Sequence, residues 1–372
     1  MGQSETKSGK RKLNTALNAV CPYFTMFPLE FPYRILQQYA SRGEAVLDPF
    51  AGRGTTLYAA RLNGLPAYGI DSNPVAVAIS QAKLANTSSG RVIRACATIL
   101  DEYRTPKRVP TGDFWKNAFH EDVLHMLCRL REGLLENCES DARKALRAIL
   151  LGALHGPLNK CEPSYFSNQC PRTFAPKPAY AVTFWRKRRL LPPDVDIVSI
   201  VRRRAQRCFA DEVTVASGVA LQGDSQRASS FVLPKRVSWI VTSPPYYGMR
   251  TYIPDQWLRW WFLGGPDTVD YSNAHQLAHT SQTVFGDGLR QVWSNCASVA
   301  KPGCRLVVRF GAINDRKVDP AQLIKESLQD SAWRLLTLRN AGSASAGKRQ
   351  ADTFVSSSDP IEEYDVWATL AV

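Results

Sequence analysis

Short apolar runs alternate with helical periodicity in the first hundred residues. In "EAVLDPFAGRGTTLYAARLNG", Ala45 to Leu47 read as a buried strand, two glycines then mark a tight turn, and residues 55–63 continue as a helix that Gly64 closes. The stretch "PAYGIDSNPVAVAISQAKL" repeats this order, with a strand up to Ile70 and a helix from about Pro74. Two successive strand–loop–helix units predict an α/β fold with a doubly wound, mostly parallel sheet.

The alternation stops near residue 96 and resumes near residue 217. Between them lie two amphipathic helical patterns, at about 114–137 and 140–155, and a basic helix at about 195–209. Strands return in "VALQGDS", "VSWIVTS" and "GCRLVVRFG", and "RLLTLRN" with "EYDVWATLAV" indicates an antiparallel C-terminal hairpin at the sheet edge. We therefore predict a basic flexible N-terminus, an α/β domain in two parts, and a mainly helical, basic insertion: residues 1–20, residues 21–95 with 215–372, and residues 96–214.

Composition narrows the class of protein. The chain has 372 residues, 44% of them hydrophobic, which is enough for a substantial core. Lys and Arg outnumber Asp and Glu by 47 to 33, for a formal net charge of +14, and this balance favours a polyanionic partner such as nucleic acid. No apolar run has the length of a membrane span, and the N-terminus lacks the apolar core of a secretory signal. We expect a cytoplasmic protein.

The nine cysteines are scattered, and no two of them form a CxxC pair. In a chain of this size and compartment they are expected to be reduced thiols. His155, Cys161 and Cys170 lie near one another in sequence, but their spacing is irregular and a fourth ligand is not evident. We therefore expect no metal site.

Acidic side chains follow three of the expected strands. Asp48 precedes the glycine turn, Asp71 ends the second strand, and Asp224 ends "VALQGDS". Because glycines have no side chain, a ligand can approach the backbone of a glycine turn closely. An acid at the tip of the second strand is placed to accept hydrogen bonds from a ribose diol. Three acids suit a neutral or cationic nucleoside better than a polyphosphate. The alternative is that Asp48 and Asp71 cap helices and the glycines only make a turn.

Taken together, "YFTMFPLEFPYRIL", "VLDPFAGRGTT", "YGIDSNP", "GDS" and "TSPPYYG" resemble the amino-group-specific DNA methyltransferases, which use S-adenosylmethionine. The resemblance covers residues 20–95 and 215–372 and leaves the insertion unmatched. It implies a Rossmann-like methyltransferase fold and a cofactor site, in which Asp48 holds the ammonium of the cofactor, Asp71 its ribose and Asp224 its adenine. The residues implied to line the methionine end are Phe24, Thr25, Phe50, Gly52, Gly54 and Thr56.

The chain departs from the family in two ways. Arg53 stands in the glycine turn where the family usually has a small residue; because the turn acts through its backbone, we expect cofactor binding to survive. The variable block lies between Asp71 and Asp224, whereas many members place the serine–proline motif first. Target recognition by residues 96–214 is therefore inferred from position alone.

The S-P-P-Y tetrapeptide, Ser243, Pro244, Pro245 and Tyr246, fits methyl transfer to an exocyclic amine. Such an amine is a weak nucleophile, so positioning and oriented dipoles supply most of the rate. The prolines stiffen the backbone so that a main-chain carbonyl, expected to be that of Pro244, faces the amine, with Ser243 as a second partner. Tyr246 offers a stacking face to a flipped base. Tyr247, Met249 and Trp257 are further candidates for this wall, with core packing the preferred reading for Trp257, Trp260 and Trp261.

Serine before the prolines favours cytosine N4, since adenine-directed members more often have Asp or Asn there. We therefore predict a site-specific DNA methyltransferase that acts on the N4 of a flipped cytosine by direct transfer, with adenine N6 as the alternative. RNA or protein-glutamine methylation and a catalytically inactive DNA-binding regulator are weaker alternatives. Ring-carbon methylation is disfavoured, because the chain has no Pro-Cys pair. The expected partner is double-stranded DNA, and a cognate restriction endonuclease is left open.

Residues 172–207 contain ten Lys and Arg but only two acids, a local excess of +8. With Tyr180, Phe184 and Trp185 interleaved, this segment is predicted to contact DNA phosphates. The alternative is a solvated basic face. The predicted DNA-binding residues are Arg186, Lys187, Arg188, Arg189, Arg202, Arg203 and, in the Gly- and Ser-rich stretch 341–350, Arg349.

Overall fold

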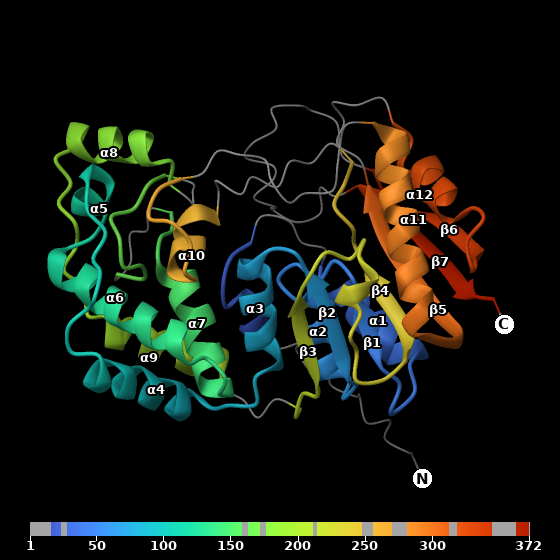
Figure 1. Cartoon of the computed structure of the whole chain (residues 1–372), viewed down its shortest axis with the longest axis horizontal. Coiled ribbons are helices and arrows are strands. Elements are labelled where there is room, and N and C mark those ends of the chain that lie inside the picture. Colours follow the sequence, from blue (N-terminus) through green and yellow to red (C-terminus); the bar gives the residue numbers. More distant parts are fainter. Residues whose placement is uncertain are drawn as a thin grey trace, which may run out of the picture.

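A single seven-stranded sheet organises the chain in a computed structural model (Figure 1). The structure describes residues 16–23, 28–157, 163–171, 176–210, 214–247, 256–269, 281–311, 318–343 and 362–371. The strand order is β3-β2-β1-β4-β5-β7-β6. The strands are β1 (Val46–Asp48), β2 (Ala67–Asp71), β3 (Gly218–Gln222), β4 (Val237–Thr242), β5 (Ala300–Gly311), β6 (Trp333–Ser343) and β7 (Glu362–Leu370).

β1 to β5 pair in parallel, and only β7 runs in the opposite direction. β1 pairs in parallel with β2 on one side and β4 on the other, with Val46 opposite Ala67 and Trp239. β7 is antiparallel to both β5 and β6, and β6 forms the edge. The predicted doubly wound sheet with a C-terminal antiparallel hairpin is thus confirmed. The strand order reverses between β1 and β4, and ligands of such sheets bind beyond the carboxyl ends of the strands at this point.

Alternate side chains of each strand enter two separate cores. Val46 packs with α1 (Glu30–Tyr39), α2 (Thr55–Leu62) and α3 (Pro74–Leu84), whereas Leu47 packs with α11 (Gln282–Val299) and α12 (Pro320–Leu328) on the other face. Residue-by-residue alternation is what a pleated strand imposes. Because both faces are covered, the strands read as continuous apolar runs in sequence.

The residues between the two parts of the sheet form a helical unit beside it (Figure 1). α9 packs against α4 and α7, α6 packs against α4, and α5 packs against α8. The predicted mainly helical insertion is thus confirmed. Its helices are α4 (Ser89–Glu102), α5 (Asp113–Ala118), α6 (Glu121–Glu136), α7 (Asp141–Ala153), α8 (Pro178–Lys187) and α9 (Ile197–Cys208), joined by α10 (Trp257–Phe262) from beyond β4.

The single helix predicted at about 114–137 is wrong, because the chain breaks it between α5 and α6. Phe119 and His120 are extended there. The carbonyl of Ala118 accepts the backbone N–H of Asn168 at 2.6 Å, and the Asn168 side chain donates to the carbonyl of Asn117 at 2.8 Å. A residue fifty positions away thus caps the end of α5, which local periodicity does not reveal.

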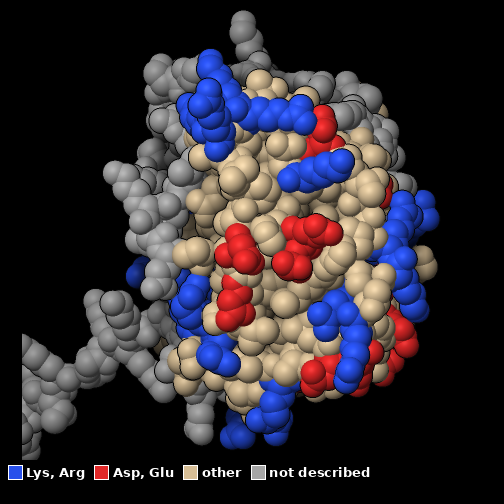
Figure 2. Space-filling view, turned by 90° about the vertical axis from the view of Figure 1, so that its left-hand side faces the viewer, with Lys and Arg blue, Asp and Glu red and all other residues tan. Residues whose placement is uncertain are grey.

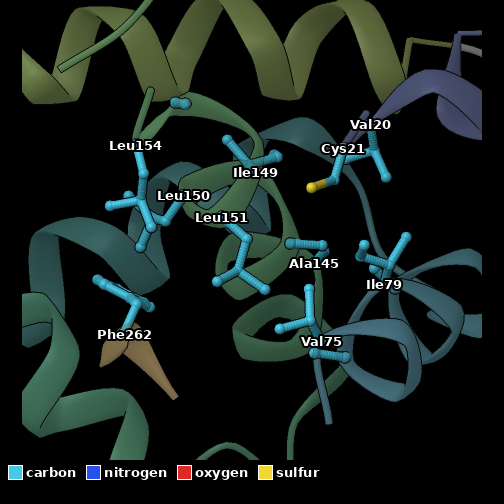
Figure 3. Close-up of a cluster of buried hydrophobic side chains, with 14 of the residues drawn as sticks. Val20, Cys21, Val75, Ile79, Ala145, Ile149, Leu150, Leu151, Leu154 and Phe262 are labelled. Carbon is cyan, nitrogen blue, oxygen red and sulfur yellow. The ribbon is translucent and has the colours of Figure 1, made fainter. Parts of the chain in front are cut away.

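The folded part of the chain begins earlier in the sequence than predicted. Residues 16–20 were assigned to a flexible N-terminus, yet Leu17, in the 3-10 turn η1 (Leu17–Ala19), is fully buried. Val20 and Cys21 pack between α3 and α7 (Figure 3). The folded part therefore includes residues 16–20. None of the helices in the described ranges has the length and apolar character needed to cross a bilayer.

Candidate functional site

The carboxyl ends of β1, β2, β3 and β4 bring the predicted acids and the S-P-P-Y tetrapeptide to one edge of the sheet. Asp48 and Asp71 are the last residues of β1 and β2, and Asp224 follows β3 by two residues. Ser243 directly follows β4. All four strands run in the same direction, so these ends meet at the switch point between β1 and β4.

Asp48 is buried and half satisfied. Its Oδ1 accepts the hydroxyl of Thr242 at 2.6 Å and the N–H of Phe50 at 3.0 Å, while its Oδ2 is buried with no hydrogen-bond partner. Burial raises the pKa of Asp48 to about 6, although the hydrogen bond from Thr242 acts to lower it. A buried carboxylate oxygen without a donor is costly, and a cationic ligand would satisfy it.

Asp71 ties the glycine turn to β2. Its Oδ2 accepts the N–H of Gly52 at 2.8 Å and its Oδ1 accepts the N–H of Asn73 at 2.8 Å. Burial raises its pKa to about 6, and the two backbone donors oppose this shift. Since an ionised carboxylate has about four acceptor positions, lone pairs remain for further donors. Tyr23 lies beside this group, where its hydroxyl accepts the Asn73 side-chain amide at 3.1 Å.

The turn between β1 and α2 needs glycine at two positions. Gly52 and Gly54 have φ of +51° and +74°, in the left-handed region. A Cβ on Gly54 would lie 2.7 Å from Oγ of Ser80, which itself donates to the Gly52 carbonyl at 2.9 Å. The turn thus packs directly on Ser80 of α3, and its backbone lies next to the sheet edge.

Two residues predicted to line the methionine end differ in their exposure. Phe50 is half-buried and meets Trp293 edge-on at 6.4 Å between ring centroids. Thr56 is fully buried, and its hydroxyl donates to the Val241 carbonyl at 3.1 Å. Thr56 therefore ties α2 to β4, and its contact with the cofactor stays a prediction.

Arg53, the residue that departs from the family, is 7% exposed. It makes no hydrogen bond or ion pair to any part of the chain that the structure describes, and its Nε is buried without an acceptor. Burial lowers the pKa of Arg53 to about 10, so the guanidinium stays charged at neutral pH. Asp48 and Arg53 are five residues apart in sequence. Oδ2 of Asp48 and Nε of Arg53 are thus both buried without a hydrogen-bond partner.

Asp224 is half-buried after β3. Its Oδ1 accepts the N–H of Gln226 at 2.9 Å, and its Oδ2 lies 3.6 Å from Nε of the exposed Arg227. The next residue, Ser225, is buried and donates its hydroxyl to the Pro49 carbonyl at 2.5 Å. This contact holds the loop after β3 against the loop after β1, and it brings Asp224 to the same edge as Asp48.

The S-P-P-Y tetrapeptide lies between this edge and the C-terminal hairpin. Ser243 and Pro245 are half-buried, whereas Pro244 and Tyr246 are buried. The Tyr246 hydroxyl donates to Oε1 of Glu363 on β7 at 2.5 Å, and its ring meets Phe310 edge-on. A Cβ on Gly311 would lie 3.1 Å from the Tyr246 ring, so a glycine at the end of β5 makes room for that ring.

The other aromatic candidates are divided between two cores. Tyr247 is buried and meets Phe285 edge-on at 5.4 Å, on the face of the sheet covered by α11. Trp257 packs on Phe114 and Trp115 in the helical unit, so core packing is confirmed for it. Of the other two tryptophans of α10, Trp261 is likewise buried and Trp260 is half-buried.

The basic residues predicted to contact DNA form two groups. Residues 186–189 lie at the end of α8, which packs on α5, whereas Arg202 and Arg203 lie on α9, which packs on α4 and α7. All six are exposed. Arg186 is paired with Asp113 at 2.8 Å, and Arg188 lies 4.0 Å above the Phe184 ring. Figure 2 shows Lys and Arg gathered at the level of α8, with acids mixed among them elsewhere on this face.

Some predicted residues lie outside the described residues: Phe24, Thr25, Arg349, Met249 and Cys161. Of the rejected zinc ligands, His155 is buried with Nδ1 2.7 Å from the Ser167 hydroxyl. Burial, with Arg259 nearby, lowers the pKa of His155 to about 3. Cys170 is buried and free. Within the described ranges, His, Cys, Asp and Glu side chains form no cluster that could hold a metal ion.

Residues 2–82 match the sequence model of a family described as DNA methylase, the N6 and N4 methyltransferases. This segment is similar to that family. The match contains β1, the glycine turn, β2 and most of α3. It confirms the family resemblance and supports a methyltransferase, while β4 and the S-P-P-Y tetrapeptide lie beyond the matched residues.

Comparison with solved structures gives weaker similarities. The rRNA methyltransferase aviRa from Streptomyces viridochromogenes is 12% identical, with 96% of this chain and 94% of that chain covered and a TM-score of 0.39. TrmN from Thermus thermophilus is 10% identical, with 98% and 55% covered and a TM-score of 0.39. A SAM-dependent methyltransferase from Methanosarcina mazei is 8% identical, with 93% and 99% covered and a TM-score of 0.33. No curated protein matches the chain.

Sequence reasoning did not find several residues that build the site. Thr242, Ser225, Glu363 and Tyr23 are polar side chains that bond across elements at this edge. The available signals were weak: a threonine at the end of an apolar strand, a serine after an aspartate, and an acid at an inward position of β7. Their importance comes from partners far away in the sequence.

Proposed function

We propose that this chain is a DNA methyltransferase that transfers a methyl group from S-adenosylmethionine to the exocyclic N4 of a flipped cytosine. One observation carries the proposal. Thr242, the residue before the S-P-P-Y tetrapeptide, donates its hydroxyl to Asp48 at 2.6 Å. The end of β4, where the acceptor amine would be held, is therefore in direct contact with the end of β1, where the cofactor would be held.

The residues at the edge fit the cofactor. The unpartnered Oδ2 of Asp48 suits its ammonium group, and the remaining lone pairs of Asp71 suit its ribose hydroxyls. Gly52 and Gly54 keep the intervening backbone free of side chains. When bound, the cofactor supplies an electrophilic methyl carbon on a sulfonium. Asp224, after β3, is left to face the adenine.

The S-P-P-Y tetrapeptide is suited to hold the acceptor amine. An amine conjugated with a ring needs acceptors for both N–H groups so that its lone pair can turn toward the methyl carbon. The half-buried Ser243 and the carbonyl of Pro244 supply such acceptors, and the two prolines fix the backbone between them. As the new N–C bond forms and the S–C bond breaks, the amine loses one proton to solvent.

The Tyr246 ring is the proposed stacking surface for the flipped base. The residue as a whole is 8% exposed, and its hydroxyl donates to Glu363. A ring fixed in this way keeps its orientation, as an aromatic wall for a flipped base requires. In this proposal the base lies against the accessible part of the ring, and Glu363 holds the ring in place.

Double-stranded DNA is the proposed substrate because exposed cations flank the helical unit. Residues 186–189 and the pair Arg202 and Arg203 lie on different helices, so we propose that they contact phosphates at separate places. Replacing each group by alanine in turn, and measuring DNA affinity at several salt concentrations, identifies the group that contacts phosphate. Each lost phosphate contact lowers the slope of log K against log salt by about 0.9.

The deciding experiment is product analysis. The purified chain is incubated with methyl-labelled S-adenosylmethionine and unmethylated DNA of high sequence complexity, and the DNA is digested to nucleosides and separated. We expect N4-methylcytosine from the parent protein and none from the Ser243→Ala variant, with RNA of equal complexity unlabelled. N6-methyladenine as the only product moves the target base to adenine, and label confined to RNA rejects the DNA proposal.

A further inference from the structure

The segment that follows α8 presents two leucines to solvent. Leu191 is 84% exposed, the largest fraction among the large apolar side chains that the structure describes, and Leu190 before it is 37% exposed. A single exposed leucine is ordinary on a protein surface. These two directly follow the four consecutive cations of residues 186–189, so apolar and positive surface meet at one place. We call residues 186–191 the α8 tip.

The backbone of the α8 tip is held on both sides of Leu191. The Leu190 N–H donates to the carbonyl of the fully buried Trp185 at 3.0 Å, and the Leu190 carbonyl accepts the Asn168 side-chain amide at 3.4 Å. Pro192 follows Leu191, and a proline has a fixed φ and also restricts the residue before it. Leu191 is therefore exposed on a backbone with few alternative conformations.

The last cation of the α8 tip has a strained backbone. Arg189 has φ of +54°, in the left-handed region that residues with a Cβ rarely adopt. Its N–H donates to the Arg186 carbonyl at 3.1 Å, so this conformation turns the chain between α8 and the leucines. Glycine adopts such a turn without strain, whereas this chain has a cation there. Strained residues of this kind cluster where a protein meets a ligand.

Two of the four cations of the α8 tip remain for a partner. Arg186 pairs with Asp113 at 2.8 Å, and the guanidinium of Arg188 lies 4.0 Å above an aromatic ring of α8. Lys187 and Arg189 make no ion pair with any residue in the described ranges. Both are exposed, so they flank the leucines with charge that nothing on the described chain neutralises.

A partner of the α8 tip must offer negative charge and an apolar interior together. One acid, Asp194, lies three residues after Leu191, against the four cations of residues 186–189, so the local surface attracts an anion. Duplex DNA has phosphates on its surface and stacked bases within, and apolar side chains can enter between two base pairs as wedges that bend the helix. Figure 1 shows α8 at the top of the helical unit, on the side toward which β1 and β4 also run. The tip and the proposed active site therefore face the same side of the molecule, as contact with one duplex requires.

We propose that Leu191 inserts between two base pairs of the DNA duplex while Lys187 and Arg189 bind neighbouring phosphates. This inference rests on the proposed function and adds to it a contact with the interior of the duplex. A wedge of this kind removes stacking at one base step and bends the helix. A duplex that is bent and partly unstacked releases a base at lower cost, and methyl transfer to a flipped cytosine needs that release.

The test measures how strongly the protein unwinds DNA, and it needs neither turnover nor a known recognition sequence. Closed circular DNA is relaxed by a topoisomerase in the presence of the protein, the protein is removed, and the change in linking number is measured by gel electrophoresis. We expect the parent protein to lower the linking number and the Leu191→Ala variant to lower it much less at equal occupancy. Duplex affinity should fall about 10-fold, the low end of the value for burying one leucine side chain. The salt dependence of binding should stay as in the parent, because no phosphate contact is lost.

Two further variants separate the wedge from the charges and from exposure alone. Val215→Ala is the matched control, since Val215 is 77% exposed before β3 in a stretch of the sequence without Lys or Arg, and it should behave as the parent does. Replacing Lys187 and Arg189 together by Gln should flatten the salt dependence of DNA binding, by about 0.9 in slope for each lost phosphate contact. All four replaced side chains are exposed, so each variant should keep the thermal unfolding midpoint of the parent.

The contrary outcomes are distinct. No unwinding by the parent, or equal unwinding by the parent and by Leu191→Ala, shows that the leucine does not enter the duplex. If Leu191→Ala instead loses binding to vesicles of phosphatidylcholine and phosphatidylserine in equal parts, and unwinds DNA as the parent does, the tip serves an anionic membrane and the inference is wrong. In these cases N4-methylcytosine in the product analysis leaves the proposed function standing. A parent protein that binds no duplex DNA at low salt overturns the proposed function and the inference together.

Discussion

Replacing Asp48 by Asn should make the protein more stable at alkaline pH while weakening its binding of the cofactor. The pKa of Asp48 is about 6, against an ordinary value of 3.8, because burial disfavours its charged form. Each unit of pKa corresponds to about 1.36 kcal/mol, so ionising this carboxyl in the fold costs about 3 kcal/mol relative to the unfolded chain. Asn has the same shape, and its Oδ1 can accept from Thr242 and from the Phe50 N–H as Asp48 does.

The direction of the pH dependence follows from the folded pKa being above the unfolded one. The folded protein holds this proton more tightly, so the contribution of protonated Asp48 to stability is complete below about pH 4 and is lost as pH rises through 6. We expect Asp48→Asn to raise the free energy of unfolding by about 2–3 kcal/mol at pH 8 and to change it little at pH 4.

Urea denaturation followed by tryptophan fluorescence at pH 4, 6 and 8 measures this difference. The control is Asp101→Asn, which neutralises an exposed carboxyl near the end of α4 and should leave the unfolding free energy nearly the same at all three pH values. A variant that is destabilised at pH 8, or whose difference from the parent does not depend on pH, would show that the enclosed Oδ2 of Asp48 is not under electrostatic strain.

Three further predictions concern the turn, the tetrapeptide and the basic surface. Gly54→Ala should lower the free energy of unfolding by more than Gly303→Ala. Both positions have φ of +74°, but only the Cβ at position 54 would collide, with Ser80. Equal losses of unfolding free energy in urea denaturation would rule out the collision. Tyr246→Ala should reduce turnover roughly 5- to 150-fold, the effect of losing 1–3 kcal/mol of stacking, with cofactor affinity by calorimetry nearly unchanged; normal turnover would make the ring structural. Replacing residues 186–189 by alanine should flatten the salt dependence of DNA binding, whereas the parent slope would show that these charges form a solvated face.

The sheet could be predicted because its evidence is local. Each strand of the first two units is a short apolar run that ends in an acid, and each helix after it starts at a glycine turn or at a proline. Asn73 illustrates this, since its side chain caps α3 by accepting the N–H of Val75 at 2.9 Å, a contact between near neighbours. The hairpin of β6 and β7 was visible for the same reason.

Features that depend on distant partners could not be predicted. The break between α5 and α6 follows from Asn168, and no glycine or proline marks it in the sequence between residues 113 and 136 except Gly133, well inside α6. The acids of the site were found from strand ends. Thr242, which donates to Asp48, and Ser225, which donates to the Pro49 carbonyl, come from segments that only the sheet brings together. The excess of basic residues in 172–207 could be read from the sequence. Their distribution over two helices, α8 and α9, follows from packing and could not.

The position of β4 beside β1 has a consequence for how the chain is made. Leu47 and Ile240 are neighbours in the sheet, but β1 ends about 190 residues before β4 begins. At synthesis rates of about 5–20 residues per second, roughly 10 to 40 seconds pass before β1 can meet this partner. During that time one apolar edge of β1 is unpaired, and an unpaired edge is a site of aggregation. The helices α4 to α9 all precede β4 in the chain, so the helical unit can fold first and pack on α3. Substitutions in it should therefore affect the yield of folded protein before they affect chemistry.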